Sequence, residues 1–168
     1  MSAGTEVRPA TALDVATIAR IHAEGIAERV ATFATAPPGA EKVERLIASD
    51  AIVLVAVHDG AVVAFAKVGP YDDPADYYSG VGEATLYVSR DARRGGTGAA
   101  LLDALAAEAE RRGHWKLVGK IFDSNAPSLA LVRSCGWREV GTHLRHGRLD
   151  GTWKDVVVVE RLLGEAAR

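Results

Sequence analysis

A chain of 168 residues, 48% of them hydrophobic, is long enough to bury a substantial core, and we expect residues 1–168 to form a single domain. The formal net charge of −2 gives no basic excess that would indicate nucleic-acid or membrane partners. The lone Cys135 cannot form a disulfide within this chain and suits a reducing compartment. The longest apolar run, residues 51–57, is too short to span a bilayer, and the first residues lack the plan of a signal peptide, so we expect a cytoplasmic protein.

In the first half of the chain, helices and strands alternate. Residues 6–8 predict a short strand, and Thr11 with Asp14 predicts the cap of an amphipathic helix that continues to about Ile26. A loop over residues 30–39 leads to a second short helix. The continuously apolar residues 52–57 then indicate a central strand, and Asp59-Gly60 predicts a hairpin turn into a strand over residues 61–68.

The second half begins with a predicted loop, rich in glycine, proline and acidic residues. Strands and helices follow it, and together they indicate a mixed α/β sheet. In chain order we expect a loop over 71–82, a strand over 83–89, a helix that ends at Gly113, a strand over 117–122, a helix from Asn125, and a final hairpin of residues 137–146 and 152–162 around Leu149-Asp150-Gly151.

The most informative segment is the glycine-rich bend between the strand at residues 83–89 and the helix that follows it. Three glycines in four positions, at 95, 96 and 98, let the backbone turn tightly. The first N–H groups of the helix have no partner within the helix and carry partial positive charge, so the bend predicts a phosphate site. Arg93 and Arg94 add charge suited to a pyrophosphate. We expect a bulky side chain at Gly96 or Gly98 to occupy the space that this pyrophosphate needs.

Two common nucleotide motifs do not fit this bend, although an ordinary strand–helix turn with solvated arginines does. A P-loop requires a lysine and then a serine or threonine directly after its last glycine, and neither follows Gly98. A dinucleotide fingerprint requires Gly-x-Gly-x-x-Gly near the start of a βαβ unit, whereas this bend reads Gly-Gly-x-Gly in mid-chain.

The bend instead resembles the Arg/Gln-x-x-Gly-x-Gly/Ala signature of the GNAT acetyltransferases. The strand at residues 83–88, the segment from Asn125 to Gly136-Trp137 and the first strand and helix are also similar to that family, in the expected order. Within it, Thr32-Phe33, Gly69-Pro70-Tyr71 and residues 141–156 resemble phosphinothricin and arsinothricin N-acetyltransferases. The resemblance implies a GNAT-like fold with a mostly antiparallel central sheet, flanked by helices, in which the fourth and fifth strands splay apart.

The resemblance implies acetyl-CoA as the co-substrate and assigns its contacts. Leu86 and Val88 would offer backbone hydrogen bonds to the pantetheine arm, and the Val88 N–H would polarise the thioester carbonyl. Asn125 would face the cofactor, although a helix N-cap is its alternative role. The backbone of the bend would hold the pyrophosphate; the residues implied there are Arg93, Arg94, Gly95, Gly96, Thr97, Gly98 and Ala99.

The resemblance also implies a catalytic base and a small amine substrate. Glu83 matches the acidic residue that takes the proton from the amine, with an exposed strand-end carboxylate as its alternative role. Val132 stands where relatives have the tyrosine or histidine that protonates the leaving thiolate, so we assign no residue to that step. Relatives are commonly homodimers.

The acceptor side is expected to bind an anionic amino acid, yet the loop after Gly69-Pro70 is acidic where relatives are basic. Lys120, and Arg145 or Arg148, could supply the missing charge, and Phe33 and Tyr77 are candidate walls of the site. His143 and His146 have no ligand spacing to other residues, so we predict no metal. Another amine (a polyamine, an aminoglycoside or a protein N-terminus) and a non-catalytic acyl-CoA-binding module remain alternatives.

Overall fold

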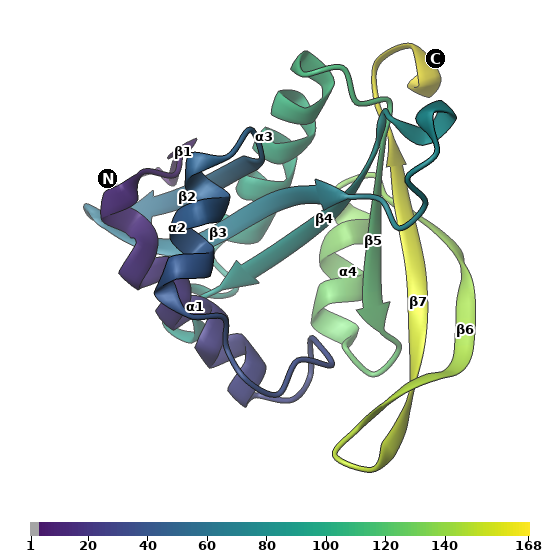
Figure 1. Ribbon diagram of the computed structural model, residues 1–168, viewed down its shortest axis with the longest axis horizontal. Coiled ribbons are helices and arrows are strands. Elements are labelled where there is room, and N and C mark those ends of the chain that lie inside the picture. The colour runs from purple at the N-terminus through teal and green to yellow at the C-terminus, as the bar shows by residue number, and fades with distance from the viewer. Residues whose placement is uncertain (1–3) are drawn as a thin grey trace.

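The computed structural model describes residues 4–168, and in it a seven-stranded sheet carries helices on both faces (Figure 1). The strands are β1 (Glu6–Pro9), β2 (Ile52–His58), β3 (Ala61–Pro70), β4 (Val81–Val88), β5 (Lys116–Phe122), β6 (Arg138–Leu149) and β7 (Thr152–Leu162). The helices are α1 (Val15–Ala27), α2 (Ala40–Ala48), α3 (Thr97–Arg111) and α4 (Ala126–Ser134), and the 3₁₀ turns are η1 (Ala12–Asp14), η2 (Asp76–Tyr78), η3 (Arg90–Ala92) and η4 (Gly164–Ala167).

The sheet is mixed and mostly antiparallel. Its strand order is β1-β2-β3-β4-β5-β7-β6, and β4 with β5 is the parallel pair. These two strands pair only where Val81 to Glu83 meet Lys116 to Val118, and beyond that point they diverge (Figure 1). The predicted fold class and the predicted splay of the fourth and fifth strands are therefore confirmed.

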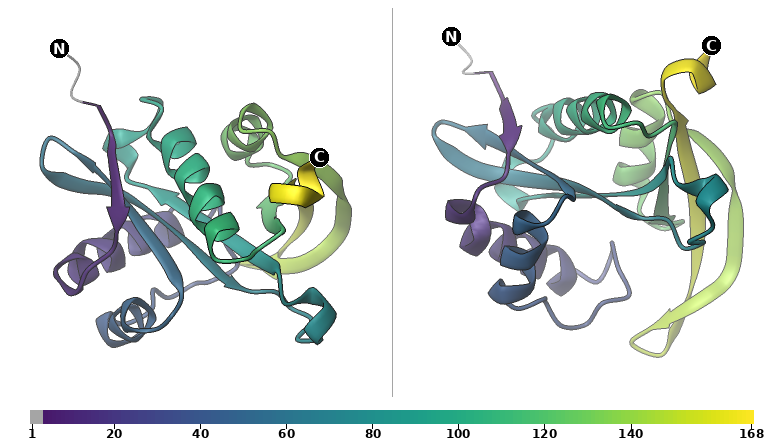
Figure 2. Two further views of the ribbon diagram at one scale, coloured as in Figure 1. Left: turned by 90° about the horizontal axis from the view of Figure 1, so that it is seen from above. Right: turned by 45° about the horizontal axis from the view of Figure 1, so that its top comes forward.

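The helices pack in pairs on opposite faces of the sheet, as the two views of Figure 2 show. On one face, α1 and α2 bury side chains such as Ile21 and Val43 against Phe65 of β3. On the other face, α3 and α4 bury a larger core that includes Leu105 and Leu129. Because burying apolar area is the dominant stabilising term, this double cover explains why β2 is apolar along most of its length.

Local sequence signals determine several element ends. The predicted helix cap of Thr11 and Asp14 is present just before α1, where the Thr11 N–H donates to the Asp14 carboxylate at 2.7 Å. The β2–β3 hairpin has positive φ at both turn residues, 49° at Asp59 and 78° at Gly60, as the Asp-Gly pair predicts. Gly113, with φ of 92°, follows the end of α3.

The predicted loop at 71–82 differs in two details. It contains the short turn η2, and β4 already begins at Val81, so Glu83 is the third residue of its strand rather than the first. Backbone pairing with β3 and β5 extends the strand over Val81 and Gly82 despite the glycine. Within residues 4–168, no helix combines the length and hydropathy needed to cross a membrane.

Candidate active site

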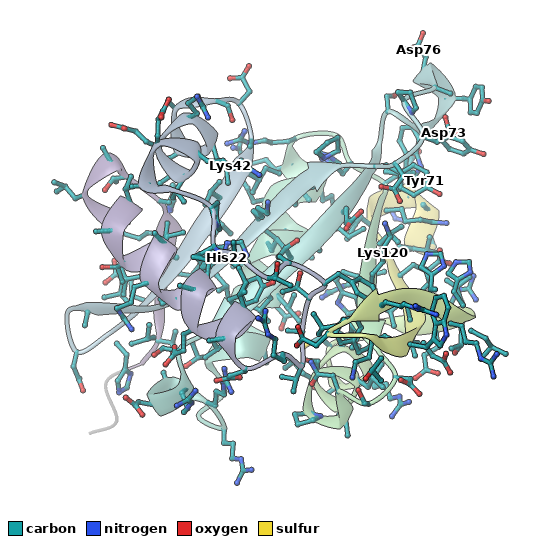
Figure 3. All side chains as sticks on the ribbon, turned by 60° about the horizontal axis from the view of Figure 1, so that its bottom comes forward. His22, Lys42, Tyr71, Asp73, Asp76 and Lys120 are labelled. Carbon is teal, nitrogen blue, oxygen red and sulfur yellow. The ribbon has the colours of Figure 1, made fainter. Side chains whose placement is uncertain are left out.

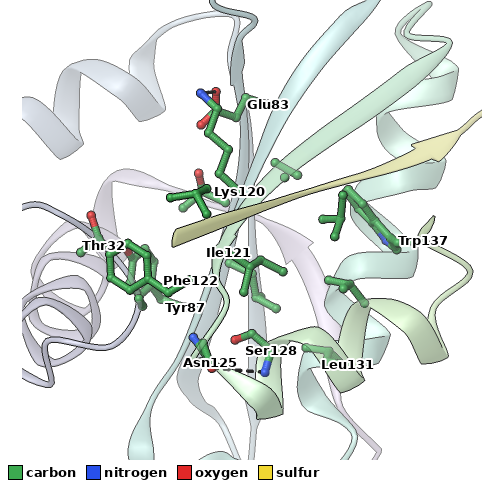
Figure 4. A pocket seen from close by; sticks show the side chains of 18 of the residues that line it. Thr32, Glu83, Tyr87, Lys120, Ile121, Phe122, Asn125, Ser128, Leu131 and Trp137 are labelled. Atoms are coloured by element: carbon green, nitrogen blue, oxygen red, sulfur yellow. Dashed lines mark hydrogen bonds and ion pairs between the residues drawn. The ribbon is translucent and has the colours of Figure 1, made fainter. Parts of the chain in front are cut away.

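A cavity of about 500 Å³ lies where β4 and β5 separate (Figure 4). Successive side chains of a strand face opposite sides of the sheet. The cavity therefore has a polar end with Glu83 and Lys120, and an apolar end that reaches α3 and α4. The lining residues come from the loop after α1, from β4 and β5, from α4 and from the β6–β7 hairpin: Ala31, Thr32, Phe33, Glu83, Ala84, Thr85, Leu86, Tyr87, Leu102, Gly119, Lys120, Ile121, Phe122, Asn125, Ser128, Leu131, Val132, Trp137, His146, Gly147, Val156 and Val159.

The edge of β4 that faces β5 has free backbone groups. The Ser89 N–H donates to the Val63 carbonyl oxygen at 2.8 Å, so alternation along the strand directs the N–H groups of Leu86 and Val88 to the opposite edge, toward the opening. The Val88 carbonyl oxygen there accepts a hydrogen bond from Nε of Arg93 at 3.1 Å. An extended ligand can therefore pair with β4 as an added strand would.

The glycine-rich bend carries a run of free donors at the start of α3. Gly96, the N-cap, has φ of 82°, a left-handed conformation that suits glycine. Within residues 4–168, no acceptor pairs with the backbone N–H groups from residue 94 to 99. A Cβ added at Gly95 or Gly96 would meet nothing within 4 Å. These donors and the open space beside them fit a phosphate group.

The two arginines of the bend are placed differently. Both arginines are exposed, but Arg93 donates to Glu28 of the turn after α1 at 3.0 Å, a carboxylate that also pairs with Arg90. Burial raises the pKa of Glu28, but hydrogen bonds from Arg93 and Arg90 outweigh it, and the net shift is downward. Glu28 lies 65 residues from Arg93, and no local sequence signal identifies it as a partner.

Two residues of the predicted cofactor site face the protein itself. A Cβ at Gly98 would lie 2.9 Å from Leu131 and 3.7 Å from Leu86, so a side chain there would first contact these two cavity-lining residues. Gly98 is the second residue of α3, and this position faces α4. Asn125 lines the cavity and is also the N-cap of α4: its Oδ1 accepts from the Ser128 N–H at 3.3 Å, and its Nδ2 donates to the Val30 carbonyl oxygen at 3.2 Å.

The polar end of the cavity is formed by an ion triad. Nζ of Lys120 on β5 lies 3.2 Å from Oε2 of Glu83 on β4, and 2.5 Å from Oδ2 of Asp72 in the loop after β3. Burial lowers the pKa of Lys120, but the hydrogen bonds to Asp72 and Glu83 outweigh it, and the net shift is upward. A cation and a carboxylate thus lie side by side in the cavity.

Aromatic rings form the wall beside this triad. Phe33 packs on Phe122 with ring centroids 4.8 Å apart, and a Cβ at Gly147 would lie 2.7 Å from its ring, so glycine permits that packing. Phe33 lines the cavity, where the sequence placed it as a candidate wall. Tyr77 is 73% exposed on η2 and packs on Tyr78 outside the cavity, because its loop continues past the end of the sheet, where Figure 3 labels Tyr71, Asp73 and Asp76.

The two arginines proposed as further cations also lie elsewhere. The guanidinium of Arg148 lies 4.2 Å from the ring centroid of Trp153, and the backbone of Arg145 is bound to Asp155 at 2.6 Å; neither residue lines the cavity. In residues 4–168 no group of three or more histidine, cysteine, aspartate or glutamate residues is arranged to hold a metal.

Some cavity residues were not predicted. Thr85 follows Glu83 by two positions on β4, so strand alternation places it on the same face, a signal that the sequence did carry. Thr32, His146 and Gly147 reach the cavity from distant segments, and no local pattern indicates this. Val132 is buried in the cavity wall and has no proton to donate.

Comparison with known proteins agrees with this geometry. The model of the Acetyltransferase (GNAT) family matches residues 21–137, more than half of the chain. The chain belongs to this family. A phosphinothricin N-acetyltransferase from Streptomyces viridochromogenes is 33% identical over 156 residues, which cover 90% of this chain and 84% of that protein. An L-methionine sulfoximine/L-methionine sulfone acetyltransferase from Pseudomonas paraeruginosa is 32% identical over 115 residues, which cover 68% and 62%.

Solved GNAT structures share the fold. A phosphinothricin acetyltransferase from Sinorhizobium meliloti in complex with AcCoA superimposes with a TM-score of 0.88 at 28% identity, over 96% of this chain and 90% of that one. A ribosomal-protein-alanine N-acetyltransferase from Brucella melitensis has the same TM-score at 31% identity, over 94% and 99%. The present GNAT protein is an N-acetyltransferase that uses acetyl-CoA.

Proposed function

We propose that this GNAT enzyme acetylates the amino group of a small acidic amino-acid-like compound of the phosphinothricin or arsinothricin type. The observation that carries the proposal is the Lys120–Glu83 pair, 3.2 Å apart in the cavity at the open edge of β4. The cation can hold an anionic group of the acceptor, and the carboxylate can receive the proton of its amine. The names of two relatives, which act on phosphinothricin and on methionine sulfoximine, support this class of acceptor.

The chain's residues supply proton transfer and charge stabilisation. An amino-acid amine is mostly protonated at neutral pH and must lose a proton before it attacks. Glu83 takes this proton, directly or through water, while Lys120 orients the acceptor. Acetyl-CoA supplies the acetyl group: the N–C bond forms, the C–S bond breaks, and CoA leaves as a thiolate. The Val88 N–H at the open edge donates to the carbonyl oxygen, where negative charge develops. Val132 cannot protonate the thiolate, so water does.

Release of CoA from acetyl-CoA, measured over a panel of amines, tests this proposal. Phosphinothricin and methionine sulfoximine should be acetylated with higher kcat/KM than neutral amines or spermidine. Lys120→Met should chiefly raise the KM for the acidic acceptors, because it removes ground-state binding of the anion. A higher kcat/KM for neutral amines would refute the acidic class of acceptor.

A cationic amine is the second candidate, favoured by the acidity of the loop after β3. Asp72, Asp73 and Asp76 are all exposed there. Figure 3 shows Asp73 and Asp76 near one end of the sheet. If this loop attracts the acceptor, spermidine should be the preferred substrate in the same panel, and the preference should weaken as salt screens the charges.

A further inference from the structure

The Lys120 ammonium is shared by two carboxylates that differ in how firmly they are held. Glu83 lies in an interior strand, with Gly69 of β3 and Val118 of β5 as its neighbours, and its side chain is 29% exposed. Asp72 lies in the loop after β3, and its side chain is 71% exposed. In the part of the chain that the structure describes, Asp72 makes no hydrogen bond other than the one to Lys120.

The Asp72–Lys120 contact is therefore the member of the triad that costs least to break. Exposed ion pairs contribute about 0–1 kcal/mol, because water and salt solvate both partners when they separate. Within residues 4–168 the Glu83 carboxylate also has Lys120 as its one hydrogen-bond partner, but it is 29% exposed against 71% for Asp72, so water and salt screen its pair with Lys120 less. A further carboxylate or phosphinate that enters the cavity thus meets a cation whose second partner is replaceable.

We propose that Asp72 is a specificity-determining residue that competes with the acceptor's anionic group for Lys120. Without an acceptor, Asp72 occupies the cation. An acceptor that brings its own anionic group, together with its contacts elsewhere in the cavity, exchanges for Asp72. A tethered carboxylate acts at an effective concentration in the millimolar range, so simple free anions are outcompeted. This inference rests on the proposed function, because it requires an acceptor that has an anionic group.

The test compares Asp72→Asn with the wild type in two assays. The first is the KM for phosphinothricin in the CoA-release assay. The second is calorimetric binding of glutarate, a dicarboxylate that has no amine to acetylate, to protein saturated with CoA. With glutarate titrated above the millimolar effective concentration of Asp72, removal of the competitor should lower both the KM and the glutarate Kd about 3–5-fold, the scale of a single exposed ion pair.

Asp76→Asn is the matched control, because it removes the same charge from the same loop at a residue that does not contact Lys120. It should leave the KM and the Kd within about 1.5-fold of the wild-type values, because salt screens the remaining long-range interaction between Asp76 and Lys120. In a Lys120→Met background, Asp72→Asn should have no further effect on either quantity, since the site of competition is gone.

Three results would overturn the proposal: a higher KM and Kd in Asp72→Asn, no change in either, or equal effects of Asp72→Asn and Asp76→Asn. Failure of the proposed function can be told apart. If the wild type acetylates no acidic amine, the assigned substrate class is wrong, while glutarate binding still decides whether Asp72 competes for Lys120.

Discussion

The backbone of Glu83 pairs with a strand on each side, and its carboxylate lies 3.2 Å from Lys120 in the cavity. Glu83→Gln keeps the shape and removes the basic oxygen. We expect kcat to fall about 10²–10⁴-fold, the scale of a lost general base, with unchanged affinity for acetyl-CoA. Raising the pH should restore part of the rate, because more of the amine is then neutral. Steady-state kinetics from neutral to alkaline pH measures both effects.

A matched control for this prediction is Glu139→Gln, which removes a carboxylate from an ion pair with Arg133 outside the cavity. Its kcat should remain within about 2-fold of the wild type, as expected for a change in an exposed pair. Near-normal turnover of Glu83→Gln at neutral pH would mean that water removes the proton and that Glu83 is a structural carboxylate.

Single residues of the site were predictable where a motif or a strand position determines them. Glu83 and Lys120 lie on strands that the sequence defines, and the structure brings them together. The partner of each was harder to predict, since Asp72 is 48 residues from Lys120 and Glu28 is 65 residues from Arg93. Such contacts depend on which strands and helices become neighbours, and local sequence does not carry that information. For the same reason, the sequence suggested Tyr77 as a wall of the site, whereas its side chain lies outside the cavity.

At the level of elements, the bend before α3 offers two glycines with opposite surroundings. A side chain at Gly95 would enter open space, whereas one at Gly98 would collide with Leu131 of α4. We therefore expect Gly95→Leu to weaken acetyl-CoA binding at least about 10-fold, which corresponds to 1.4 kcal/mol, with little change in Tm. Gly98→Leu should lower the Tm. Calorimetry for binding and thermal unfolding for stability separate the two; unchanged affinity in Gly95→Leu would contradict the phosphate site.

At the start of α1, we predict that the free energy of unfolding depends on pH. Hydrogen bonds from Arg8 lower the pKa of buried Asp14 to about 2, against burial and with help from Thr11. Because the folded-state pKa lies below the ordinary value, the stabilisation is present above about pH 4 and is lost as the pH falls toward 2. Asp14→Asn should cost about 2 kcal/mol at pH 7 and much less near pH 2.

Urea unfolding at the two pH values measures this difference. Glu41→Gln is a suitable control, since it removes an exposed i,i+4 pair with Arg45 and should cost less than about 0.5 kcal/mol. An equal cost of Asp14→Asn at both pH values would show that shape rather than charge matters at this cap.

Most elements follow from local pattern, because apolar spacing, caps and Asp-Gly turns each act within a few residues. The predicted ends of α1, α2, β2 and β5 agree with the structure to within about two residues, the usual uncertainty of such boundaries. The 3₁₀ turn η2 was not predicted, since it lies in a loop rich in glycine, proline and aspartate, which are compatible with many loop conformations.

At the scale of the whole molecule, the strand order and the splay were expected from the family resemblance alone. Periodicity indicates that a strand is buried on both faces, but not which strand lies beside it. The parallel pairing of β4 with β5 over only three residues creates the cavity, and hairpin signals cannot reveal it because these strands are separated by α3. The site is therefore a property of topology, and this explains why Thr32 and His146 were missed.

We expect acetyl-CoA to bind only the folded protein, since the cavity residues come from distant elements that include β4, β5, α4, the loop after α1 and the β6–β7 hairpin. A ligand that binds only the folded state stabilises it by about 2.7 kcal/mol at 100 times its Kd. For a domain of this size, that corresponds to a rise in Tm of about 5–11 °C. Differential scanning fluorimetry should show this rise with acetyl-CoA and little change with ATP or NAD at equal concentration. A rise with NAD but not with acetyl-CoA would mean that the free N–H groups at the start of α3 serve another ligand.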